Sequence, residues 1–208
     1  MELWEYERAA WREGAETVCG VDEAGAGPLM GPVYAAAVIL PRELDIPSLN
    51  DSKKLTEKKR EALYEIITAQ AAAWSVARVE AAEIDEMDIL NARMLVMQRA
   101  IDALSLRPEL ALIDGNRDHG SRYAIETPHC LIVGGDGKSA SIAAASILAK
   151  VSRDRYVAEV LDKQYPQYQF AKHKGYGTKL HYQMLDRYGP CPEHRETFLK
   201  KWEARRRG

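Results

Sequence analysis

The sequence has few cysteines and no long apolar run, and both absences narrow the class of protein. Its three cysteines, Cys19, Cys130 and Cys191, are odd in number and far apart. Neither a disulfide framework nor a paired-cysteine zinc site is therefore expected. No stretch approaches the ~18 consecutive apolar residues of a membrane-spanning helix, and residues 1–16 are too charged for a secretory signal peptide. We expect a soluble, cytoplasmic protein.

A strong net charge is also lacking, but the charges are unevenly distributed. The formal net charge of the 208 residues is −2. The charged residues of 80–88 are all acidic, whereas 138–182 contains eight Lys or Arg and three acids. A basic surface beside clustered carboxylates suits a metal-dependent enzyme that acts on a polyanion, although each charge run alone is equally typical of a solvated surface.

Hydrophobic periodicity predicts an α/β protein with a mixed five-stranded sheet flanked by helices. We expect strands at 17–21, 33–40, 73–79, 110–114 and 131–133. We expect helices near the N-terminus, from Thr56 through Ile67, and at 89–105, 139–165, 179–187 and 197–206. The short turn between the first two strands favours an antiparallel pair. Residues 1–165 are expected to form the main domain and 166–208 a helical C-terminal extension.

Acidic residues fall where the predicted strands end. Asp22, Asp114 and Asp136 each lie at or just past such an end, where an α/β fold places its ligand crevice. Glu23 follows Asp22 directly, so the chain must turn at Glu23 if both side chains are to reach one site. Neighbouring carboxylates repel unless a cation lies between them. We interpret the four acids as ligands of Mg²⁺ or Mn²⁺, although each one alone is also typical of a turn or surface residue.

A glycine turn, Gly25-Ala26-Gly27, follows the first two acids. Glycines let a phosphate or a sugar approach the bare main chain. A dinucleotide-binding turn is excluded, because Pro28 and Pro32 lead into an expected strand and not into a helix N-terminus.

Five motifs, in one order, make the chain resemble bacterial ribonuclease HII. They are Gly-Val-Asp-Glu-Ala-Gly at 20–25, Asp-Ser-Lys-Lys-Leu at 51–55, Leu-Ile-Asp-Gly-Asn at 112–116, the segment 141–154 and His-Lys-Gly-Tyr-Gly-Thr at 173–178. The resemblance implies a ribonuclease H-like fold in residues 1–165 and a monomer. It also implies cleavage of the RNA strand of RNA–DNA hybrids and nicking on the 5′ side of single ribonucleotides in duplex DNA. Two Mg²⁺ or Mn²⁺ ions would support hydrolysis that leaves a 3′-hydroxyl.

The resemblance also implies roles for individual residues. Carried over by motif, the catalytic and metal-binding acids are Asp22, Glu23, Asp114 and Asp136. The substrate-binding residues are Gly25, Ala26 and Gly27 at the ribose 2′-hydroxyl, Tyr176 as the substrate-sensing ring, and Lys53, Lys54, Ser146 and Lys150 at phosphates. The 2′-hydroxyl is the group that separates RNA from DNA, and a ring between two glycines can lie flat against a sugar or base.

One position departs from the family pattern. The family's loop normally reads Gly-Arg-Gly or Gly-Lys-Gly, whereas this chain has Ala26. Loss of a charge-assisted phosphate contact should cost on the order of 1.5–3 kcal/mol of substrate binding. The alternative is therefore an RNA–DNA junction-binding protein with little or no cleavage. The sister family, ribonuclease HIII, has an extra N-terminal domain, for which the residues before Thr17 leave no room. The roles of His173, His181 and His194 stay open.

Overall fold

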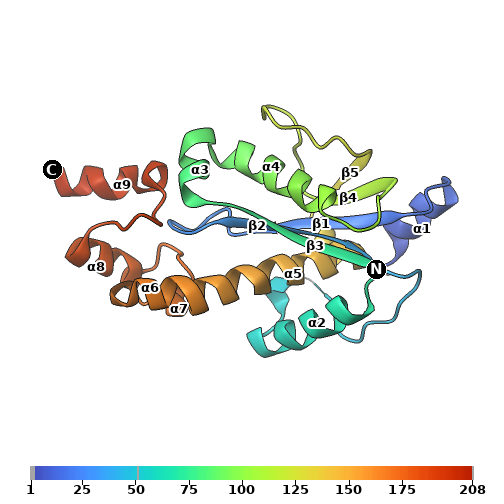
Figure 1. Ribbon diagram of the computed structural model, residues 1–208, viewed down its shortest axis with the longest axis horizontal. Coiled ribbons are helices and arrows are strands. Elements are labelled where there is room, and N and C mark those ends of the chain that lie inside the picture. The colour runs from blue at the N-terminus through green and yellow to red at the C-terminus, as the bar shows by residue number, and fades with distance from the viewer. Residues whose placement is uncertain (1–2, 51, 208) are drawn as a thin grey trace.

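A five-stranded sheet with helices on both faces forms the centre of the computed structural model, which describes residues 3–50 and 52–207, the side chain of Arg207 excepted (Figure 1). Asp51 of the motif at 51–55 lies outside the described residues. The strands are β1 (Val18–Ala24), β2 (Val33–Ile39), β3 (Ala73–Val79), β4 (Leu110–Asp114) and β5 (His129–Ile132). Their order is β3-β2-β1-β4-β5, with β1–β2 and β2–β3 antiparallel and β1–β4 and β4–β5 parallel. The predicted mixed sheet is confirmed.

Helices cover both faces of the sheet (Figure 1). They are α1 (Glu5–Arg12), α2 (Glu57–Gln70), α3 (Ala81–Met87), α4 (Ile89–Asp102), α5 (Ala140–Tyr156), α6 (Asp162–Gln164), α7 (Phe170–His173), α8 (Lys179–Tyr188) and α9 (Glu196–Arg207). Figure 1 shows α3 and α4 on one face, α2 and α5 on the other, and α8 and α9 at one end. Among the described residues, no helix has the length and apolar character to span a membrane.

The central strand β1 is packed on both faces, and its alternation decides which side chains meet which helix. Cys19 and Val21 belong to the core that α4 covers. Gly20 faces α5 so closely that an added Cβ would lie 2.0 Å from the carbonyl carbon of Ser141. Glycine at position 20 therefore sets how deeply α5 approaches the sheet.

One expected element boundary is wrong, and one helix was not predicted. The strand β1 does not end at Asp22 but continues to Ala24, because Ala24 still pairs with Tyr34 of β2. The acidic stretch at 80–88 contains a short helix, α3, which begins with a capping box between Glu80 and Glu83.

The expected long helix at 139–165 corresponds to α5, a π-helical turn over Val157–Leu161 and α6. The chain beyond it returns to the connection between β1 and β2. The amide of Leu29 donates to the carbonyl of Gly175 at 2.9 Å, and the amide of Arg195 donates to the carbonyl of Leu29 at 2.9 Å. The division of the chain at residue 165 stays a prediction.

The contact at Gly20 gives a test of the packing of α5. We expect Gly20→Ala to lower the free energy of unfolding by about 2 kcal/mol or more, because the new methyl group would meet backbone atoms that cannot rotate away. The matched control is Gly27→Ala, where nothing lies within 4 Å of an added Cβ and the change should stay within about 1 kcal/mol. Urea denaturation measures both, and equal losses would contradict this account of the packing.

Candidate metal centre

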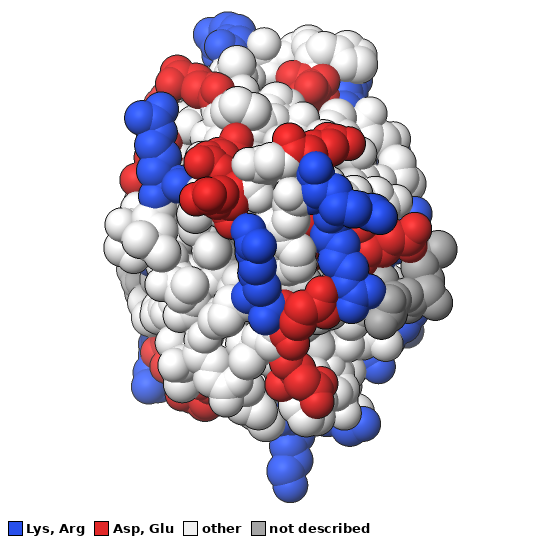
Figure 2. All heavy atoms as spheres, turned by 90° about the vertical axis from the view of Figure 1, so that its right-hand side faces the viewer, with Lys and Arg blue, Asp and Glu red and all other residues white. Residues whose placement is uncertain are grey.

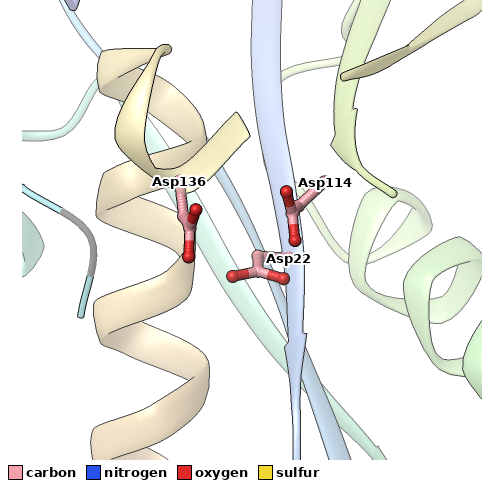
Figure 3. A group of neighbouring side chains, drawn as sticks. All are labelled: Asp22, Asp114 and Asp136. Atoms are coloured by element: carbon pink, nitrogen blue, oxygen red, sulfur yellow. The ribbon is translucent and has the colours of Figure 1, made fainter. Parts of the chain in front are cut away.

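Three aspartates from three separate elements converge at one edge of the sheet (Figure 3). Asp22 lies in β1, and Asp114 ends β4. Asp136 lies in a short 3₁₀ helix, Gly135–Gly137, that precedes α5. One carboxylate oxygen of each lies within 4.8 Å of the others. The strands β1 and β4 are parallel neighbours, so their carboxyl ends meet at the same edge. The predicted convergence of these three acids is therefore confirmed.

Local hydrogen bonds orient the carboxylates. The amide of Gly135 donates to Oδ1 of Asp114 at 2.7 Å, which brings the turn of Asp136 against the end of β4. The amide of Glu23 donates to Oδ1 of Asp22 at 2.7 Å. The hydroxyl of Ser146 on α5 acts on the same carboxylate by lowering the pKa of Asp22. Main-chain donors thus hold both aspartates.

Burial makes this group of charges costly. Burial raises the pKa of Asp22 well above its usual value, and the charges of Glu23 and Asp114 raise it further. Burial also raises the pKa of Asp114, with the charge of Asp136 adding to the effect and the amide of Gly135 opposing it. The ionised carboxylates repel one another, and a cation bound between them would remove that repulsion.

Glu23 lies on the opposite face of β1 from Asp22, next to α4. Its Oε1 forms an ion pair with Nη2 of Arg93 at 2.6 Å. Its Oε2 is buried and has no hydrogen-bond partner among the described residues. Burial raises the pKa of Glu23, and Arg93 opposes that shift. The turn expected at Glu23 does not occur. Sequence reasoning also missed Arg93, which has no local signal because its partner lies on a distant strand.

These observations fit a divalent cation with oxygen ligands. Three repelling carboxylates share a small volume, and Glu23 Oε2 beside them is an acceptor without a donor. Burying such an acceptor is costly unless it gains a partner. The ammonium of Lys53 lies 2.9 Å from Oδ2 of Asp136, but its side chain is 74% exposed. An exposed lysine offsets only part of the buried charge, so the donor set suits a hard divalent cation.

A cleft of about 200 Å³ opens beside the acids. Its lining residues are Asp22, Glu23, Ala24, Gly25, Ala26, Ser52, Lys53, Asp114, Ser146, Lys150 and Tyr176. Of the residues predicted for the site, Asp136, Gly27 and Lys54 do not line it. Asp136 still belongs to the acidic group, and the ammonium of Lys54 lies 3.9 Å from the point where a Cβ of Gly137 would stand. Gly27 lies further along the glycine turn.

The predicted phosphate-binding side chains have partners within the protein. The hydroxyl groups of Ser146 and Ser52 are 2.7 Å apart and buried. Lys150 bonds to Asp154 at 2.8 Å, and its ammonium lies 5.7 Å from the centroid of the Tyr176 ring. Tyr176 is 43% exposed, so its ring is accessible from the cleft. Phosphate contacts of these residues stay predictions.

A wholly buried arginine, Arg195, holds the glycine turn. Its guanidinium group donates to the carbonyl oxygens of Gly25 (2.7 Å), Ala26 (3.0 Å), Pro28 (2.9 Å) and Gly31 (2.8 and 3.0 Å). Burial lowers the pKa of Arg195. The carbonyl groups take the place of water around this charge, and the guanidinium group fixes the position of the carbonyl groups.

A second wholly buried arginine, Arg153 of α5, joins the glycine turn to the loop of Tyr176. It donates to the carbonyl oxygens of Met30 (3.2 Å), Pro32 (3.1 Å) and Lys174 (3.0 Å). Gly25 has φ of +92°, and an added Cβ there would lie 2.1 Å from Nε of Arg153. Sequence reasoning missed both arginines, because a buried and an exposed arginine look alike in a sequence.

The surface at the end of the molecule that carries α1 has charges of mixed sign. Figure 2 shows this end, where Lys and Arg alternate with Asp and Glu without a large patch of one sign. A polyanion is held by a continuous field of positive charge. This face does not present such a field (Figure 2).

The raised pKa of Asp22 gives a prediction about metal-free protein. An acid whose pKa is raised by folding stabilises the fold while protonated and loses that contribution as the pH rises through the folded pKa. In the presence of EDTA at pH 7–8 we expect Asp22→Asn to be more stable than the parent by about 0.5–2 kcal/mol. The gain should shrink as the pH falls towards 3.8, the usual value for this acid.

Thermal and urea unfolding across this pH range measure the effect. The control is Asp102→Asn in the exposed last turn of α4, which should show no such trend. Added Mg²⁺ or Mn²⁺ should stabilise the parent more than Asp22→Asn. A variant that is less stable than the parent at every pH would contradict the electrostatic interpretation.

Comparison with known proteins agrees with the geometry. The family model described as Ribonuclease HII matches residues 19–204. The chain is 55% identical over 197 residues to the Ribonuclease HII of Endomicrobium trichonymphae, covering 94% of this chain and 91% of that protein. It is 54% identical over 181 residues to that of Neisseria meningitidis serogroup C, covering 86% and 90%.

Solved structures show the same fold. The ribonuclease H2 from Pyrococcus horikoshii OT3 superposes with a TM-score of 0.74 at 27% identity, covering 92% of this chain and 99% of that one. The Bst-RNase HIII structure in complex with Mn²⁺ gives a TM-score of 0.57 at 20% identity, covering 91% and 67%. This second likeness concerns the fold alone.

Proposed function

Because the chain belongs to the ribonuclease HII family and is a metal-dependent endoribonuclease, we propose that it cleaves the RNA strand of RNA–DNA hybrids and nicks duplex DNA on the 5′ side of single ribonucleotides. The observation that carries the proposal is the convergence of Asp22, Asp114 and Asp136 beside a glycine turn whose carbonyl groups are fixed by Arg195. Two of these aspartates, Asp22 and Asp114, line one cleft with Gly25 and Ala26, which would place metal ligands beside a main-chain surface for a sugar.

Four acids would hold two divalent ions. Asp22, Asp114 and Asp136 supply convergent oxygens, and Glu23 supplies the buried Oε2 that no donor reaches. Two bound Mg²⁺ or Mn²⁺ ions would supply an activated water and stabilise the leaving oxygen in an in-line attack on the phosphodiester, leaving a 3′-hydroxyl. Arg93 holds Oε1 of Glu23, so Oε2 stays oriented and available.

The remaining residues of the cleft would orient the substrate. The main chain of Gly25, Ala26 and Gly27 would meet the 2′-hydroxyl, since Arg195 engages the carbonyl groups of the turn from the buried side. The exposed ring of Tyr176 would lie against the sugar or base at the junction.

Positive side chains around the cleft would bind the phosphates. We assign this role to Lys53, Lys54 and Lys150, with Ser146 one helical turn before Lys150. The Lys53 ammonium would leave Asp136 and engage the substrate backbone when metal ions neutralise the acids. We further propose a monomer that acts in the cytoplasm, with 1–165 as the catalytic domain and 166–208 as its extension, on the strength of composition and family.

Asp114→Asn tests the metal centre directly. Cleavage of duplex DNA that contains one ribonucleotide, with Mg²⁺ or Mn²⁺, should fall by at least about 100-fold, because even groups that only support a ligand contribute 10–100-fold. The control is Asp118→Asn, outside the cleft lining, which should cut at the parent rate. Equal cutting by Asp114→Asn and the parent would disprove the mechanism, and a 2′,3′-cyclic phosphate product would show attack by the ribose itself.

Ala26→Arg tests the missing cation of the glycine loop. The added guanidinium should restore a charge-assisted phosphate contact of about 1.5–3 kcal/mol, which corresponds to an increase in kcat/KM of roughly tenfold or more. Ala26→Gln, of similar length and without charge, is the matched control and should gain much less. Absence of cleavage by both Ala26→Arg and the parent, with hybrid binding intact, would favour the junction-binding alternative.

A further inference from the structure

Three histidines gather in a buried cluster beneath the loop that carries Tyr176. His173, His181 and His194 are 7%, 0% and 3% exposed, so none of them faces solvent. The rings of His173 and His181 stack with centroids 4.4 Å apart, and the ring of Phe170 contacts all three. Nε2 of His181 lies 3.0 Å from Nε2 of His194. The proposed chemistry uses none of these rings.

The neighbouring groups fix which nitrogen of each ring carries the proton. The amide of Cys191 donates to Nδ1 of His194 at 2.9 Å, so that nitrogen is an acceptor. The neutral ring of His194 then carries its proton on Nε2 and donates it to Nε2 of His181. The proton of His181 must therefore be on Nδ1, which lies 3.0 Å from the carbonyl oxygen of Tyr176.

The opposite tautomers of His194 and His181 do not fit the surrounding groups. Nδ1 of His194 also lies 3.3 Å from the carbonyl oxygen of Cys191, a contact that would need a proton on Nδ1. His181 would then donate through Nε2 and turn the lone pair of Nδ1 against the Tyr176 carbonyl oxygen at 3.0 Å. Burial lowers the pKa of both His181 and His194 to about 4, so both rings are neutral at pH 7. One direction alone satisfies every group.

The chain of hydrogen bonds ends on a main chain that is held from several sides. The carbonyl of Tyr176 also accepts from the amide of Thr178 at 2.7 Å, and the amide of Tyr176 donates to the carbonyl of His173 at 2.9 Å. Nδ1 of His173 accepts from the amide of Gly175 at 3.3 Å, so its proton lies on Nε2, 3.0 Å from the carbonyl of Tyr168. The backbone of Tyr176 is thus fixed while its ring remains exposed.

We propose that His194 and His181 are positioning residues for Tyr176, forming a one-directional chain Cys191 N–H→His194→His181→Tyr176 C=O that holds the ring against the ribose. This proposal rests on the proposed role of Tyr176 in contacting substrate. Loss of the donor at His181 would leave the Tyr176 carbonyl with the amide of Thr178 alone, and the buried Nε2–H of His194 without its acceptor, so the loop could relax. A displacement of about 1 Å at a substrate-orienting group can cost on the order of a hundredfold in rate.

Nitrogen-15 NMR of the parent protein at pH 7 tests the proton order without any substrate. The expected result is a proton on Nε2 of His194, on Nδ1 of His181 and on Nε2 of His173, unchanged between pH 6 and 8. Opposite tautomers, or a charged imidazolium at pH 7, would overturn the proposal. This measurement stands even if the protein fails to cleave the proposed substrates.

Substitutions test the link to Tyr176. On duplex DNA with one ribonucleotide, His181→Leu should lower kcat/KM roughly tenfold to a hundredfold. His181→Asn, whose amide N–H can replace Nδ1–H, should recover at least part of the loss, and His119→Leu, at a histidine whose side chain is 80% exposed, should match the parent.

The loss should also disappear in a Tyr176→Ala background, because the ring that the chain positions is then gone. An equal loss in both backgrounds, or no recovery by His181→Asn, would show a general structural role and overturn the proposal.

Discussion

The active site depends on burying two positive charges among main-chain carbonyl groups. Arg153 and Arg195 are wholly buried, and their guanidinium groups donate to backbone carbonyl oxygens. A buried guanidinium is costly unless its donors are satisfied, so the loops around it cannot move independently. The glycine turn after β1 and the loop of Tyr176 are consequently one rigid unit, although the sequence separates them by about 150 positions.

Negative charge is concentrated just beyond that rigid unit. Asp22, Glu23 and Asp114 have pKa values raised chiefly by burial, so the protein maintains an unfavourable charge arrangement that bound cations would relieve. Arg93 pairs with Glu23, and Lys53 pairs with Asp136 beside them. The apolar core of β1, β2, α4 and α5 offsets the cost of holding these acids together.

Local sequence signals were enough for the sheet and for the convergence of the aspartates, because strand alternation and strand ends are properties of neighbouring residues. The turn expected at Glu23 was wrong because β1 continues through pairing with Tyr34 of β2, a long-range contact. The buried arginines could not be predicted, since Arg195 bonds to carbonyls 164–170 positions away. The histidine roles depended likewise on neighbours that only the folded chain brings together.

The attachment of the glycine turn to Arg195 has a consequence for biosynthesis. A nascent chain released from the ribosome tunnel up to about residue 190 contains the whole sheet and all four acids, but not the guanidinium that fixes the turn. Its acidic cluster could therefore assemble before the glycine turn is fixed. Fixing of the glycine turn would therefore wait until Arg195 has left the ribosome, well after the four acids.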